Sequence, residues 1–121
     1  MRNQIAEVAC FTADVALLAE FYEQVLGVEP SVCSDGMALF ELSGLSLLIH
    51  QGMPQTTGQP PNEDHLAVAV ADVDRACAAL RDQGFALVLE PHNYEWGRSA
   101  YLRDPDGRLI ELQDIGQASG L

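Results

Sequence analysis

The amino-acid sequence predicts an α+β fold made of two tandem βαβββ modules with curved, mixed sheets. A repeated triplet is the first observation, because the letters ADV stand at 13–15 and again, 58 residues later, at 71–73. A short apolar stretch precedes each copy and a helical pattern follows it. The two halves also end alike, with an apolar run after Gly44 and another after Gly107.

Each copy of the triplet predicts the start of a helix. Its aspartate suits the N-cap position, because the carboxylate accepts hydrogen bonds from the free amides of the first turn. We therefore expect helices over about 15–26 and 73–83, ending at Gly27 and Gly84. Glycine is common just after a helix because it tolerates the left-handed backbone conformation.

The strands are predicted from apolar runs between turn signals. In module one, about 4–51, they are expected at 4–12, 31–35, 37–43 and 45–50. In module two, about 64–114, they are expected at 64–70, 85–90, 98–103 and 108–113. A linker rich in Gly, Pro and polar residues, about 52–63, joins the modules into a single domain of residues 1–121, and a tail follows at 115–121.

Strand alternation places several polar residues on the face turned away from the helices. The first strands of the two modules carry Glu7 and His65 on that face, and the last strand of module two carries Glu111. Small side chains such as Ser46 and Ala67 share it. A solvent-exposed face would carry more charged residues, and a hydrophobic core would not contain these charged ones. The mixture of charged, small and apolar side chains therefore predicts a cup for a small molecule.

Further residues are expected to line this cup. Phe11, Met37 and Leu48 would supply apolar lining, although core packing explains any one of them equally well. His50 shares the strand face of Leu48 and is a candidate rim residue, acid or base.

Aromatic residues and an arginine are expected at the mouth of the cup. The segment 92–104 is predicted to be a loop there, and it carries Trp96, Arg98 and Tyr101. Aromatic rings with an arginine suit a planar or anionic ligand. The alternative is that Trp96 covers one end of the core and Arg98 pairs with one of the many acidic residues.

Composition excludes some partners. The net charge of −12 disfavours nucleic acid and anionic membranes, and no apolar run is long enough to span a bilayer. Three cysteines without a CxxC pair, and an N-terminus that does not resemble a signal peptide, predict a cytoplasmic protein.

Three stretches carry a resemblance to a known family: AEFYEQVLGVEP at 19–30, EDHLAVAVADVDRACAALRDQGF at 63–85 and WGRSAYLRDPDGRLIEL at 96–112. With the paired modules, they resemble the vicinal oxygen chelate superfamily, which includes glyoxalase I, extradiol dioxygenases and bleomycin-resistance proteins. The resemblance covers about 4–114 and implies the glyoxalase/bleomycin-resistance/dihydroxybiphenyl dioxygenase fold. It also implies a homodimer in which two chains complete each site.

The resemblance further implies where a metal would bind. Ligands in the metal-using families come from the first and last strands of each module, which here gives Glu7, Leu48, His65 and Glu111. Leucine cannot ligate and Glu7 stands where His or Gln is more usual, so a three-ligand site is implied. One histidine and two carboxylates favour Mn²⁺, Fe²⁺ or Mg²⁺, and Zn²⁺ is also compatible. A metal-free polar network of the same residues is the alternative.

Two functions stay open at this point. One is a divalent-metal enzyme that stabilises an oxyanion on a small substrate with neighbouring oxygens, with Glu111 and His50 as candidate catalytic residues. Its reaction type (lyase, isomerase, transferase or dioxygenase) is undecided. The other is a metal-free binding protein for a drug or metabolite, as in the bleomycin-resistance proteins, for which the negative charge would suit a cationic guest.

Overall fold

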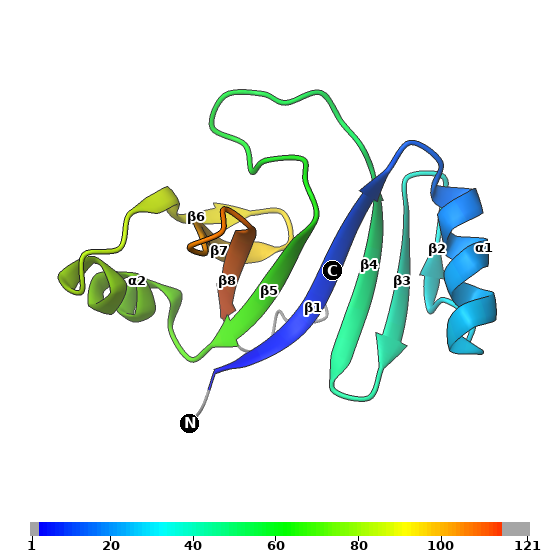
Figure 1. The fold of residues 1–121 in the computed structure, drawn as a ribbon, viewed down its shortest axis with the longest axis horizontal. Coiled ribbons are helices and arrows are strands. Elements are labelled where there is room, and N and C mark those ends of the chain that lie inside the picture. The colour runs from blue at the N-terminus through cyan, green and yellow to red at the C-terminus, as the bar shows by residue number, and fades with distance from the viewer. Residues whose placement is uncertain (1–2, 115–121) are drawn as a thin grey trace.

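The computed structural model describes residues 3–114, which form one eight-stranded sheet and two helices. In chain order the elements are β1 (Gln4–Thr12), α1 (Val15–Leu26), β2 (Val32–Cys33), β3 (Met37–Leu42), β4 (Leu45–Gln51), β5 (His65–Val70), α2 (Val73–Asp82), β6 (Leu87–Tyr94), β7 (Gly97–Arg103) and β8 (Leu109–Asp114). The strands lie in the order β2-β3-β4-β1-β5-β8-β7-β6. Figure 1 shows that the sheet is curved and open, with one helix at each end.

The two modules meet at the centre of the sheet, where β1 and β5 pair antiparallel. Within each module the first strand runs parallel to the last, β1 beside β4 and β5 beside β8. Ala67 is opposite Glu7 on one side and Glu111 on the other, and His65 lies two residues before Ala67 on the same face of β5, so three adjacent strands bring the predicted polar residues near one another. The predicted α+β fold of tandem βαβββ modules is confirmed.

The helices begin at the predicted N-caps. Asp14 Oδ1 accepts a hydrogen bond from the Leu17 amide at 3.0 Å, and Asp72 Oδ1 accepts one from the Arg75 amide at 3.1 Å. Each bond satisfies one of the free amides of a first helical turn. At the end of α1, Gly27 has a φ of 73°, the left-handed conformation that glycine adopts at low cost.

Each helix packs on the outer side of its own half of the sheet. Val15 and Ala19 of α1 contact a cluster that includes Phe40 and Ile49. Val73 and Cys77 of α2 belong to a second cluster with Val70, Ala100 and Leu112. Because both cores lie on the helix side, the opposite, concave face is left for other side chains.

The predicted loop at 92–104 overlaps the expected strand 98–103, which is present as β7, and most of the loop before it is also strand, which corrects that part of the prediction. β6 continues to Tyr94 and β7 begins at Gly97, with these two residues paired, so only Glu95 and Trp96 form the turn. Antiparallel pairing satisfies the backbone polar groups of this stretch, which a loop would leave to solvent. In module one, β2 has only two residues instead of the predicted 31–35.

Helix α1 has an exposed apolar side. Leu17, Phe21 and Val25, spaced four residues apart, are 66%, 57% and 63% exposed. Residues at this spacing share one side of a helix. Neither helix within residues 3–114 has the length and apolarity that membrane crossing requires.

Candidate functional site

The concave face of the sheet holds a cavity of about 850 Å³ at the seam between the two modules. Its floor is formed by Glu7 of β1, His65 of β5 and Glu111 of β8. The linker, which arches over the seam in Figure 1, supplies one wall. The linker residues on that wall are Met53, Pro54, Thr56, Gln59, Pro60, Pro61 and Asn62. The cavity is therefore shared by both modules and the segment that joins them.

Glu111 is buried and held by several donors. Its Oε1 is 3.1 Å from His65 Nε2, while its Oε2 accepts hydrogen bonds from Ser99 Oγ at 2.7 Å and Trp96 Nε1 at 3.1 Å. Burial opposes ionisation, but the hydrogen bonds from His65, Ser99 and Gln113 outweigh it and hold the pKa of Glu111 below its ordinary value. Glu111 is thus a carboxylate whose two oxygens are both engaged.

His65 is oriented from both sides of its ring. Nδ1 lies 3.0 Å from the Glu63 carbonyl oxygen, which can only accept, so Nδ1 carries a proton. Burial disfavours the charged ring, but the contacts with Glu111 and Glu63 prevail and raise the pKa of His65. His65 and Glu111 therefore form an imidazolium–carboxylate pair, with side chains 8% and 3% exposed.

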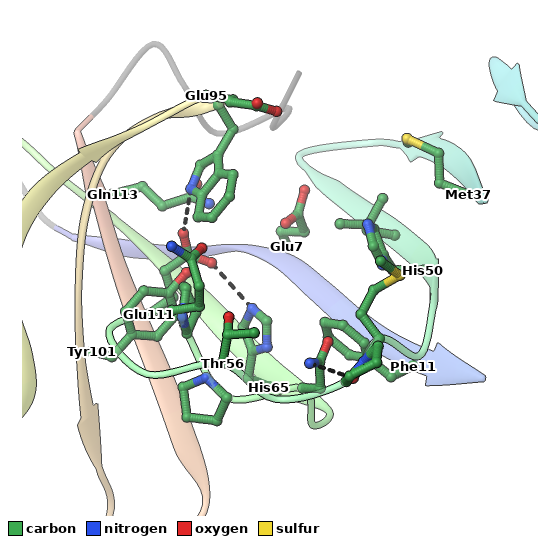
Figure 2. A pocket seen from close by; sticks show the side chains of 18 residues that line it. Glu7, Phe11, Met37, His50, Thr56, His65, Glu95, Tyr101, Glu111 and Gln113 are labelled. Atoms are coloured by element: carbon green, nitrogen blue, oxygen red, sulfur yellow. Dashed lines mark hydrogen bonds and ion pairs between the residues drawn. The ribbon is translucent and has the colours of Figure 1, made fainter. Parts of the chain in front are cut away.

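Glu7 differs from Glu111 because no group in the described part of the chain satisfies one of its oxygens. The residue is 2% exposed, and within residues 3–114 its Oε1 has no hydrogen-bond partner. Burial, together with the negative charge of Glu111, raises the pKa of Glu7 from 4.5 to about 7, although His65 acts in the opposite direction. Figure 2 shows Glu7 between the Glu111–His65 pair and the side chains of Met37 and His50.

Most residues predicted from the sequence for the cup lie around this cavity. They are Glu7, Phe11, Met37, Leu48, His50, His65, Trp96, Tyr101 and Glu111. The Phe11 ring lies 5.4 Å from the His50 ring and 6.1 Å from the His65 ring, centre to centre. Trp96 stacks on Tyr94 with centres 4.6 Å apart and planes 5° apart.

Arg98 is the exception among the predicted pocket residues, since it does not line the cavity. Its guanidinium lies on the α2 side, where Nη2 is 2.8 Å from Asp74 Oδ1 and Nε is 2.9 Å from Oδ2. The physical reason is strand alternation. Because 97–103 is strand β7, Arg98 must point away from the face that carries Ser99 and Tyr101.

Several site residues carry roles that the sequence did not reveal. Ser99 and Gln113 lie on the predicted cup face, but nothing in the sequence identified them as donors to Glu111. The linker wall has no periodic pattern that could have placed it. Its shape depends on its own hydrogen bonds, such as Asn62 Nδ2 to the Met53 carbonyl at 2.7 Å.

The donors at the floor fit a divalent ion only in part. His65 donates through Nδ1 to a carbonyl, which leaves Nε2 directed at Glu111 Oε1, the ring orientation that metal-binding histidines adopt. However, Glu111 already accepts from Ser99 and Trp96, and Leu48 offers no donor. No group of three or more His, Cys, Asp or Glu side chains within residues 3–114 is placed to hold an ion.

Comparison with known proteins identifies the family. The model of the Glyoxalase/Bleomycin resistance protein/Dioxygenase superfamily matches residues 4–112. The chain belongs to this superfamily. Its eight-stranded sheet and two helices match the fold of solved superfamily members, and the resemblance expected from the sequence is confirmed.

Individual relatives within the superfamily are distant. A probable lactoylglutathione lyase of Synechocystis sp. is 40% identical over 50 residues, which is 40% of this chain and 38% of that relative. The match therefore spans less than half of the lyase. A superfamily member from Vibrio splendidus 12B01 is 17% identical with a TM-score of 0.67, covering 93% of this chain and 99% of that one. Methylmalonyl-CoA epimerase of Streptomyces coelicolor is 23% identical with a TM-score of 0.64, covering 92% and 96%. At these identities the solved structures are similar in fold.

Proposed function

We propose that the protein binds a small organic molecule in the cavity at the seam. The observation that carries the proposal is a cavity of about 850 Å³ whose floor holds a buried carboxyl oxygen without a partner, Oε1 of Glu7. This volume lies within the range of drug-sized ligand sites. An unsatisfied buried polar atom is costly, so a ligand that donates a hydrogen bond to Glu7 would remove that cost on binding.

The walls supply the complementary apolar surface. Phe11, Met37 and Leu48 lie on the module-one side, while Trp96 and Tyr101 lie on the module-two side. Apolar and aromatic walls with a few polar groups at one end are typical of sites that hold a ligand body and orient its polar end. These features support the binding-protein alternative.

Ligand screening with a matched pair of variants tests the proposal. The chain has one tryptophan, Trp96, and it lines the cavity, so its fluorescence reports binding. Leu48→Ala should weaken binding of a hit about tenfold through lost apolar contact. Leu17→Ala, on the exposed side of α1, should leave it unchanged. A screen without hits, or hits that respond to Leu17→Ala instead, would contradict the proposal.

Proton-transfer catalysis is the second candidate function, and Glu7 favours it. A carboxyl with a pKa of about 7, facing a cavity beside a histidine–carboxylate pair, suits general acid–base chemistry. Glu7 then becomes the candidate proton carrier in place of Glu111, whose oxygens are engaged. His50 stays a rim candidate, with Nδ1 2.7 Å from the Gln51 carbonyl oxygen. The lyase among the relatives supports screening of lyase and isomerase reactions.

A divalent cofactor (Mn²⁺, Fe²⁺, Mg²⁺ or Zn²⁺) stays a proposal, with Glu7, His65 and Glu111 as its predicted ligands. If bound, it would supply Lewis-acid chemistry to neighbouring substrate oxygens. Elemental analysis of the purified chain, before and after loading with each metal, tests it beside Glu111→Ala. Near-stoichiometric metal that is lost in the variant would support the site. No metal in either protein after loading would contradict it.

The homodimer and the cytoplasmic location also stay proposals. The exposed apolar residues of α1 support the first, because contiguous exposed apolar side chains often mark protein contacts. Light scattering of the purified chain tests it. The free thiols of Cys10, Cys33 and Cys77 support a reducing compartment.

A further inference from the structure

The charged groups around the cavity are mostly acidic. Carboxyl groups of Glu7, Glu95 and Glu111 line it, together with the imidazoles of His50 and His65. No arginine in the described part of the chain lines the cavity, and the sequence contains no lysine. An anionic ligand would therefore meet three carboxyl groups without a guanidinium or ammonium to pair with.

Four of the arginines are engaged in ion pairs elsewhere. Arg98 pairs with Asp74, and Arg103 pairs with Glu63 through Nη2 and Oε1 at 2.9 Å. Arg81 pairs with Glu90, and Arg108 contacts Asp104 and Asp106 in the turn before β8. Moving one of these guanidinium groups to the cavity would break an ion pair that already exists. The acidic character of the site is thus a property of the fold as well as of composition.

The charges at the cavity floor indicate that the missing partner of Glu7 is positively charged. The positive charge of His65 is directed at Glu111, 3.1 Å away, and Glu111 also accepts hydrogen bonds from Trp96 and Ser99. Among the described residues, Glu7 has no such partner at Oε1. Figure 2 shows its carboxyl group standing apart from the two dashed interactions of Glu111. A cationic hydrogen-bond donor would supply to Glu7 what His65 supplies to Glu111.

The walls define the rest of such a ligand. Trp96, which stacks on Tyr94, and Tyr101 present aromatic surface on the module-two side, and Phe11 lies on the module-one side. Aromatic rings accept both flat apolar groups and cations near their faces. Leu48 and Met37 add flexible aliphatic contact.

We infer that the ligand of this cavity is a lipophilic amine, with a protonated nitrogen on Glu7 and a ring-bearing apolar body against the aromatic and aliphatic walls. The inference rests on the proposed function, because it names the ligand class of the same cavity. It excludes carboxylates and phosphates from the site. It also assigns to Glu7 the role of selecting ligands by charge.

A matched series of three probes tests the inference. The probes are 3,3-diphenylpropylamine, 3,3-diphenylpropan-1-ol and 3,3-diphenylpropanoate, which share one body and differ in charge. Binding is measured by calorimetry and by Trp96 fluorescence, at about physiological ionic strength so that exposed charges are screened. The amine is expected to bind about tenfold or more tightly than the alcohol, as for a hydrogen bond to a charged group. The carboxylate is expected to bind weakest.

Two variants separate Glu7 from the general negative charge of the chain. In Glu7→Gln, the advantage of the amine over the alcohol should fall to about twofold or less, with alcohol affinity retained. Glu41→Gln removes an exposed carboxylate on β3 outside the cavity and should keep the advantage. Circular dichroism checks that both variants fold.

The outcomes distinguish failure of the inferred ligand class from failure of the proposed binding function. Equal or tighter binding of the alcohol or the carboxylate overturns the charge assignment and leaves the binding function standing. An amine preference that survives Glu7→Gln shows that overall charge, not this residue, selects the ligand. Binding of none of the three probes at millimolar concentration overturns both the ligand class and the proposed function.

Discussion

Replacing Glu7 with glutamine should stabilise the protein near neutral pH and leave its stability unchanged in mild acid. The folded state keeps the Glu7 proton up to about pH 7, whereas the unfolded chain releases it near pH 4.5. The folded state therefore binds more protons between these values, and the free energy of unfolding falls as pH rises through this window. Each pH unit of the window costs about 1.4 kcal/mol, so Glu7 lowers stability by about 3 kcal/mol at pH 7 and above. Glutamine has nearly the same shape and does not titrate, so the variant escapes this cost.

Urea unfolding of both proteins, from about pH 4.5 to above pH 7, measures the effect. The difference in unfolding free energy should start near zero and rise to a plateau of about 3 kcal/mol in favour of the variant. His65 and Glu111 titrate in both proteins, so their contributions largely cancel in the difference between the two unfolding free energies. Glu41→Gln, at an exposed position, serves as the control and should show no such rise. A difference that is constant with pH, or that favours the wild type as pH increases, would refute the raised pKa of Glu7.

Two further predictions concern stability. Ser99→Ala removes a 2.7 Å hydrogen bond to the Glu111 carboxylate and should lower the unfolding free energy by about 2 kcal/mol in chemical denaturation. Ser46→Ala, at another buried serine, should lower it less. Equal losses would show that the bond to Glu111 contributes little. Phe40→Ala empties a fully buried position and should cost about 3–5 kcal/mol, while Phe21→Ala, 57% exposed, should change stability by about 0.5 kcal/mol or less. A large loss for Phe21→Ala would indicate that α1 is covered in the native assembly.

Strand alternation made much of the site predictable. Whether a side chain faces the cavity is a local property once the strand is recognised, so Glu7, His65 and Glu111 could be assigned to one face. Arg98 shows the limit of this reasoning. A strand was expected at 98–103, but Arg98 was assigned to the loop at the mouth of the cup, and the alternation of that strand was not applied to it. As part of β7, it has to point toward α2.

The different chemistry of the two glutamates could not be predicted from the sequence. Glu111 receives donors from Ser99 and Trp96, which belong to β7 and the turn before it, while Glu7 receives none at Oε1. Such differences arise from side-chain contacts between elements that are distant in sequence. The family resemblance implied a metal site at Glu7, His65 and Glu111, but the contacts among these side chains decide which one is free to meet a ligand.

The linker wall contributes to the ligand cavity but not to the β-sheet core. The floor residues belong to the paired central strands, so a change there acts on the sheet itself. The wall at 53–62 has no strand or helix and is mostly exposed. Substitutions in such a segment are usually tolerated by the fold. New ligand preferences could therefore evolve, or be engineered, in the linker while Glu7 and the β-sheet core stay as they are.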